Sequence, residues 1–106
     1  MKVVYTHSAK EDLKRICQYI LYELSAPIAA QNTSDRIMDS IRSLNTMPER
    51  NPLYKEEPWY SRGVRFISVR NYLVFYTIDS KSDCVYIVRI VYGARDISRQ
   101  LEEVLG

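Results

Sequence analysis

The segment from residue 64 to residue 92 constrains the fold most, because it holds three strand-like runs joined by very short connections. The runs are rich in β-branched and aromatic residues, as strands are, and they cover residues 64–69, 71–78 and 84–92. Turn-forming residues separate them at 70–71 and 79–83. Parallel strands need a crossover of a dozen or more residues, so these connections predict antiparallel neighbours.

The first half of the chain predicts one strand and then two helices. Residues 2–6 have strand composition. Ser8 and Glu11 match a capping box for a helix that ends near Leu24. A second helix restarts at Ser25, a good N-cap with Pro27 in the first turn, and runs to about residue 44. The tight connection predicts an antiparallel hairpin. Helical spacing assigns the buried faces to Leu13, Ile16, Cys17, Ile20 and Leu24, and to Ala30, Ile37, Ile41 and Leu44 with Met38 at the flank.

Residues 46–61 are expected to form a loop, because three prolines interrupt any periodic pattern there. Its aromatic residues, Tyr54, Trp59 and Tyr60, either pack on the core, which we favour, or present an aromatic surface. A short helix over residues 96–105 follows the last strand. The length suits one hydrophobic core, so residues 1–106 are expected to form a single domain. The predicted class is α+β: an N-terminal strand, the helical hairpin on a mainly antiparallel sheet of about four strands, and a short C-terminal helix.

Several classes of protein fit the sequence poorly. Cys17 and Cys84 are far apart, with His7 as the single histidine, so we expect no metal site, and we expect both thiols to be reduced and to face the core. No apolar run approaches the ~20 residues that cross a bilayer, and the N-terminus lacks the apolar region of a signal peptide. The expectation is a cytoplasmic protein without membrane association and without a cofactor.

Basic side chains gather in the second half of the chain. Residues 1–61 carry eight basic and eight acidic side chains, whereas residues 62–99 carry seven basic and three acidic ones. Six of the seven are arginines, whose planar guanidinium matches phosphate and carboxylate groups. This asymmetry indicates an anionic partner, nucleic acid or an acidic protein, although a solvated sheet face explains it equally well.

Several motifs, in the same order along nearly the whole chain, resemble the RelE/ParE superfamily of toxins. The first helix carries Thr6, Ala9, Asp12, Leu13, Ile16, Tyr19 and Ile20, and the second begins with Pro27, Ala29 and Ala30. Gly63, Arg65, Val69, Tyr72, Phe75 and Tyr76 follow the proline-containing loop, and residues 89–96 read R-I-V-Y-G-A-R-D. The resemblance implies the toxin of a bacterial type II toxin-antitoxin system with the RelE/ParE-like fold.

The superfamily includes two activities, and this sequence matches one of them incompletely. RelE-like members cut messenger RNA in the ribosome, and the resemblance implies Arg65, Arg95, Tyr76 and Tyr92 as their catalytic equivalents. Leu73 stands where a RelE-like arginine is expected, and Leu101 where a tyrosine is expected. RNA cleavage also needs a proton acceptor. Tyrosine, with a pKa near 10, serves poorly, and His7 is better explained as a turn residue.

The favoured interpretation is therefore ParE-like inhibition of DNA gyrase, without confidently assigned catalytic residues and leaning away from an enzyme. A ribosome-dependent messenger endonuclease is the alternative, and a partner that only binds antitoxin and operator DNA is a third. The expected target-binding residues are Arg62, Arg65, Arg70, Arg89 and Arg95. An antitoxin is expected to cover the apolar face of the last helix, Ile97, Leu101, Val104 and Leu105. Operator DNA is expected to be bound only through the antitoxin complex.

Overall fold

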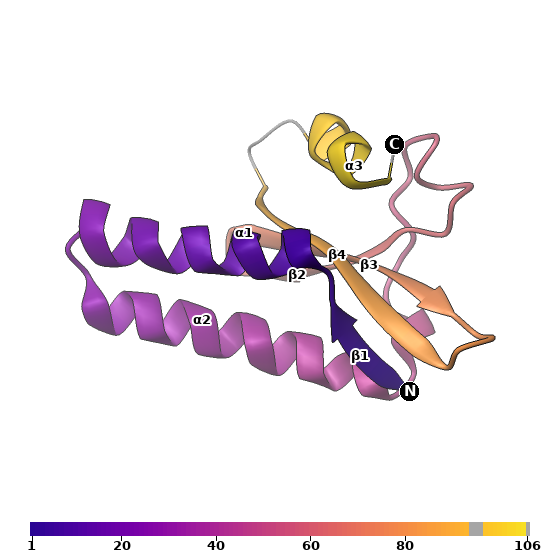
Figure 1. Cartoon of the computed structure of the whole chain (residues 1–106), viewed down its shortest axis with the longest axis horizontal. Helices are drawn as coiled ribbons and strands as arrows, with labels where there is room; N and C mark the ends of the chain where they lie inside the picture. Colours follow the sequence, from indigo (N-terminus) through magenta and orange to yellow (C-terminus); the bar gives the residue numbers. More distant parts are fainter. Residues whose placement is uncertain (94–96, 106) are drawn as a thin grey trace.

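Helices and strands follow one another in the order that the sequence predicts (Figure 1). The structure, a computed structural model, describes residues 1–93 and 97–105. The elements are β1 (Lys2–Tyr5), α1 (His7–Gln18), a π-helical turn η1 (Tyr19–Glu23), α2 (Pro27–Arg42), the 3₁₀ turns η2 (Ser43–Asn45) and η3 (Pro48–Arg50), β2 (Arg65–Val69), β3 (Tyr72–Asp79), β4 (Cys84–Tyr92) and α3 (Ile97–Leu105). The α+β class is confirmed.

The four strands form one mixed sheet in the order β1-β4-β3-β2. Strands β2, β3 and β4 pair antiparallel, as their short connections predict. Strand β1 pairs parallel with β4, from Lys2 opposite Cys84 to Tyr5 opposite Ile87. Both helices and two strands lie between β1 and β4 in the sequence, which gives the chain ample length for the crossover that a parallel pair requires.

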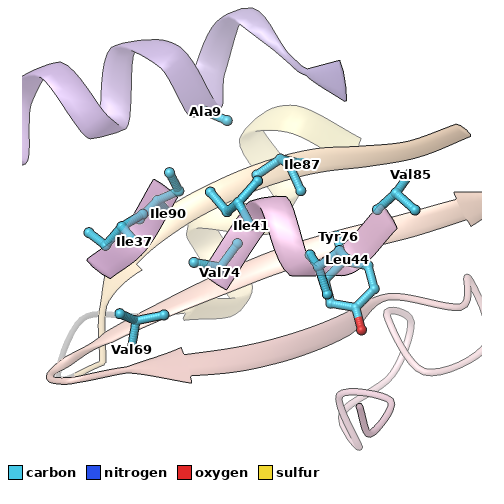
Figure 2. Packing of buried hydrophobic residues seen from close by; sticks show 10 residues of the cluster. All are labelled: Ala9, Ile37, Ile41, Leu44, Val69, Val74, Tyr76, Val85, Ile87 and Ile90. Atoms are coloured by element: carbon cyan, nitrogen blue, oxygen red, sulfur yellow. The ribbon is translucent and has the colours of Figure 1, made fainter. Parts of the chain in front are cut away.

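The helical hairpin covers one face of the sheet and encloses the larger part of the core. Helices α1 and α2 lie side by side, and their connected ends project beyond the sheet (Figure 1). The predicted stripe of α2 is confirmed, since Ala30, Ile37, Ile41 and Leu44 are all buried. Figure 2 shows how Ile37, Ile41 and Leu44 meet the sheet. The cluster consists of Ala9, Ile37, Ile41, Leu44, Val69, Val74, Tyr76, Val85, Ile87 and Ile90.

The structure corrects both predicted helix starts. The N-cap of α1 is Thr6 rather than Ser8, because the Thr6 hydroxyl accepts from the N–H of Ala9 at 3.2 Å and also donates to the carbonyl of Ile87 at 2.7 Å. The β1–β4 pairing thus decides where the helix begins. Ser25 has a φ of +49° and does not cap α2, whose N-cap position is held by Ala26.

The end of the first helix also differs from the prediction. Regular α-helix stops at Gln18, and the chain continues through the π-helical turn to Glu23. A π-helix winds more widely than an α-helix, so residues beyond it leave the stripe that i, i+3 and i+4 spacing defines. Ile20 is still buried, but Leu24, predicted to be buried, is 56 % exposed.

The other face of the sheet is covered by the loop before β2 and by α3. Successive strand residues point to opposite faces, so Phe75 and Val91 pack here while Val74 and Ile90 face the helical hairpin. This second cluster consists of Trp59, Val64, Phe75, Val88, Val91 and Leu101. Trp59 packs on the core as predicted, whereas Tyr60 is exposed.

Two further expectations concern cysteines and membranes. Cys17 and Cys84 are both free thiols, each half-buried. Among the described residues, no helix combines the length and the apolar character that spanning a membrane requires.

Candidate functional site

Arg89 and Asp12 form a buried ion pair between β4 and α1. The Arg89 Nε lies 2.7 Å from Oδ2 of Asp12, and Nη2 lies 2.8 Å from Oδ1. The backbone N–H of Ile90 also donates to Oδ2 at 3.0 Å. Arg15, whose side chain lies on the surface of α1, donates to Oδ1 at 3.1 Å. The Asp12 carboxylate therefore accepts four hydrogen bonds although it is 4 % exposed.

The same guanidinium reaches the last helix. Arg89 Nη1 donates to the carbonyl of Gln100 at 3.2 Å and lies 3.4 Å from Oε2 of Glu103. The hydrogen bond to Asp12 holds the pKa of Arg89 above its ordinary value, although burial acts in the opposite direction. Arg89 thus joins α1, β4 and α3. Arg89, expected to bind the target, is buried here and its guanidinium is engaged within the chain.

Two more of the predicted target-binding arginines hold the loop and the last helix in place. Arg65 Nη1 donates to the carbonyls of Glu49 and Asn51, at 3.0 and 2.6 Å. Arg62 stacks on Trp59, with its guanidinium carbon 5.5 Å from the ring centroid, and donates to the carbonyl of Leu105. Both side chains thus make contacts within the chain, and Arg65 is half-buried. Arg95 lies outside the described residues.

Tyr76, one of the residues implied for a ribonuclease, is fully buried. Its hydroxyl donates to the carbonyl of Pro48 at 2.6 Å and so fixes the start of the loop. Burial raises the pKa of this hydroxyl, although the neighbouring Asn51 side chain and the charges of Arg65 and Arg50 act in the opposite direction. The Tyr76 hydroxyl is thus engaged within the chain, and its implied role as a proton carrier stays a prediction.

Among the described site residues that were predicted, Arg70 and Tyr92 are exposed and make no side-chain hydrogen bond within the described part of the chain, whereas the exposed Arg62 does. Arg70 occupies the β2–β3 turn, and its exposed side chain donates no hydrogen bond to the described residues. Tyr92 ends β4 and is 44 % exposed. Both line one shallow depression, together with Asn71, Leu73 and Gly93. The structure therefore brings these two residues together and places Arg62 and Arg65 in structural contacts elsewhere.

The apolar face of α3 is already covered by the chain itself. Leu101 is fully buried in the second cluster, and Ile97, Val104 and Leu105 are half-buried against the same cluster. The indole Nε1 of Trp59 adds a hydrogen bond to the hydroxyl of Ser98 at 3.1 Å. These four residues, expected to bind the antitoxin, pack here against the second face of the sheet.

Exposed apolar side chains gather instead at the projecting end of the helical hairpin. Five large apolar residues between positions 19 and 28 are at least 36 % exposed, namely Tyr19, Leu21, Tyr22, Leu24 and Ile28. Tyr22 and Ile28 reach 71 % and 77 %. The sheet does not extend beneath this end of the hairpin (Figure 1), so the chain offers these side chains no core to enter. We call these five residues the hairpin tip.

Comparison with known proteins identifies the family of this fold and site. A family model described as the ParE toxin of the type II toxin-antitoxin system parDE matches residues 3–97. The chain is a ParE-family toxin. The match covers the sheet from Val3 onward and both helices of the hairpin, and hence Asp12, Arg70, Arg89 and Tyr92. No curated protein matches the sequence significantly.

Solved structures share the fold of this toxin. A chain from the chromosomal ParDE system of P. aeruginosa is 20 % identical with a TM-score of 0.71, and the alignment covers 87 % of this toxin and 95 % of that chain. A chain of the toxin-antitoxin complex RelBE2 from Mycobacterium tuberculosis is 21 % identical with a TM-score of 0.58, covering 89 % and 92 %. At these identities the likeness shows that the toxin shares their fold.

Sequence reasoning missed two features of this ParE-family toxin. Asp12 was recognised as part of the first-helix motif, but nothing in its spacing indicates a partner 77 residues away. The hairpin tip did leave a signal, since the run Y-I-L-Y-E-L at residues 19–24 is apolar beyond the single stripe that a surface helix needs.

Proposed function

We propose that this type II toxin arrests growth by inhibiting DNA gyrase, and that a cognate antitoxin neutralises it. The observation that supports gyrase over messenger cleavage is the second face of the sheet. Apolar side chains fill this face, and the loop and α3 cover it. Scission by 2′-hydroxyl attack needs a proton acceptor beside groups that stabilise the phosphate. The buried Tyr76 and Arg89 supply neither to an outside substrate.

Purified toxin should inhibit supercoiling by gyrase, or trap plasmid in cleaved form, and should leave ribosome-bound messenger uncut. The physical reason is that the exposed Arg70 and Tyr92 offer binding contacts without an acid–base pair. Supercoiling assays and primer extension on translated messenger measure the two activities in parallel. Codon-specific cuts with supercoiling unaffected would replace this proposal with the endonuclease, and growth without arrest on induction would leave only a regulatory partner.

The hairpin tip is the surface that we propose for the antitoxin. An antitoxin segment that orders on binding gains most of its affinity by covering apolar side chains. The α3 face is closed, whereas the tip holds five of the eight large apolar residues that are exposed among the described residues. Patches of this kind on a small soluble protein usually mark interaction sites. An amphipathic helix laid along the projecting hairpin would cover them.

A double substitution at the tip tests this surface. Tyr22→Ala with Ile28→Ala should weaken binding of the antitoxin from the adjacent reading frame by tenfold or more, since central aromatic and apolar contacts are worth roughly 1–2 kcal/mol or more each. Both side chains are largely exposed, so the melting temperature should change little. Met47→Ala, at an exposed methionine away from the tip, is the matched control for titration calorimetry. Equal affinities of the double variant and wild type would rule the tip out.

A further inference from the structure

The β2–β3 turn holds an arginine in a conformation that favours glycine. Val69 pairs with Tyr72, so the turn consists of Arg70 and Asn71 alone. Arg70 has a φ of +56°, whereas the φ of Asn71 is not positive. Two-residue hairpin turns with positive φ at only the first position normally carry glycine there, because a Cβ crowds the backbone. Arg70 therefore costs stability that glycine would not cost.

Folding gives no compensation for this cost. The side chain of Arg70 is exposed and donates no hydrogen bond within the described part of the chain, in contrast to Arg62, Arg65 and Arg89. A residue held in an unfavourable backbone conformation without intrachain contacts indicates a role toward another molecule. The β3–β4 turn offers a comparison, since Asp83 has the same φ of +56°, but aspartate tolerates this region better.

The neighbours of Arg70 complete a small recognition surface. Tyr92 pairs with Tyr72 across the strands, and their rings meet edge to face with centroids 5.8 Å apart. This contact orients the exposed ring of Tyr92 beside the turn. The N–H of Gly93 donates to the carbonyl of Asn71 at 2.9 Å, which ties the turn to the end of β4. Arg70 and Tyr92 thus lie on a turn and a strand end that are held together by these contacts, and they line the same depression as Leu73.

We propose that the Arg70–Tyr92 surface is the contact through which the toxin binds an acidic surface of its protein target; this rests on the proposed function, in which that target is gyrase. Arginine and tyrosine are the residue types that dominate binding energy at protein interfaces. The guanidinium fork of Arg70 matches a carboxylate, and the Tyr92 ring supplies apolar area. Nucleic acid fits less well, because its binding depends on neutralising several phosphates, and Arg70 is the one basic residue among the described residues that line the depression.

Arg70→Gly separates binding from folding. The variant should unfold at or above the wild-type temperature, because glycine relieves the backbone strain at the positive φ of this turn. Its inhibition of gyrase should nevertheless require a toxin concentration at least about tenfold higher. Arg70→Lys, which keeps a charge, should retain part of the inhibition, and Tyr92→Ala should weaken it. Asp83→Gly is the matched control, since it relieves the same backbone conformation at the opposite end of β3 and should leave inhibition unchanged.

Supercoiling assays and binding to immobilised gyrase subunits, with a short duplex DNA as a second ligand, give the readouts. Wild-type inhibition together with equal potency of Arg70→Gly would overturn this contact and leave the proposed function standing. Wild-type toxin without effect on gyrase would overturn the proposed function and this contact with it. If Arg70→Gly loses binding to the duplex alone and keeps binding to gyrase, the acidic protein surface is the wrong partner.

Discussion

Asp12→Ala should lower the free energy of unfolding by about 3–5 kcal/mol, the cost of breaking a buried ion pair by removing one partner. The substitution leaves the Arg89 guanidinium buried at 8 % exposure without its main counter-charge, and it leaves the N–H of Ile90 without its acceptor. Because Arg89 also binds α3, the last helix should loosen as well. Urea denaturation measures the free energy, and hydrogen exchange measures the protection of α3.

The chain offers a matched control for this pair. Asp39 on α2 forms an ion pair with Arg42, three residues further along the helix, but both side chains are at least 70 % exposed. Exposed pairs contribute little, so Asp39→Ala should cost under about 1 kcal/mol. Adding Arg89→Met to Asp12→Ala should recover part of the loss, because it removes the unpaired charge. A loss of stability for Asp12→Ala as small as that for Asp39→Ala would contradict the role of the Asp12–Arg89 pair in joining α1, β4 and α3.

Trp59→Ala should cost about 3–5 kcal/mol, as truncation of a large buried aromatic residue usually does. The indole is 3 % exposed, lies in the same cluster as Leu101, donates to Ser98 and supports the guanidinium of Arg62. Its removal therefore takes away three kinds of contact that hold α3. Thermal and urea unfolding, with exchange protection of residues 97–105, report the loss.

Two neighbouring variants separate these contributions. Trp59→Phe keeps most of the apolar body and removes the hydrogen bond to Ser98, which contributes about 0.5–1.5 kcal/mol. Tyr60→Ala removes an adjacent aromatic residue that is 48 % exposed, and it should cost much less. Comparable losses in Trp59→Ala and Tyr60→Ala would mean that the loop does not anchor the helix through Trp59.

Elements that follow a regular period could be predicted from the sequence. The three C-terminal strands and the stripe of Ile37, Ile41 and Leu44 were predicted to within a residue or two, because each pattern repeats several times. Helix ends depend on single residues and on neighbours distant in sequence. Thr6 caps α1 because it also binds the carbonyl of Ile87 on β4, and a search for local capping motifs does not include that contact.

The candidate site was predicted less well, because composition does not show which charges are already engaged. Arg65 and Arg89 are arginines in a basic segment, as is Arg70, but loop carbonyls bind Arg65 and an aspartate 77 residues away binds Arg89. Backbone acceptors have no signature in the sequence. The amphipathic pattern of α3 likewise identified an apolar face correctly, but it did not show that the chain's own sheet covers that face.

The parallel pairing of β1 with β4 makes completion of the sheet depend on contacts that are distant in sequence. Lys2 and Tyr5 are synthesised before their partners Cys84 and Ile87, which follow about eighty residues later. Until then the apolar stripe of α2 lacks the part of the sheet that β4 supplies, Val85, Ile87 and Ile90, and contacts this distant in sequence form slowly. Apolar side chains of α2 and β3 stay partly uncovered until β4 has paired, and uncovered apolar surface of this kind favours aggregation. The α2 side of the core therefore closes only when the two strands that lie farthest apart in the sequence have met.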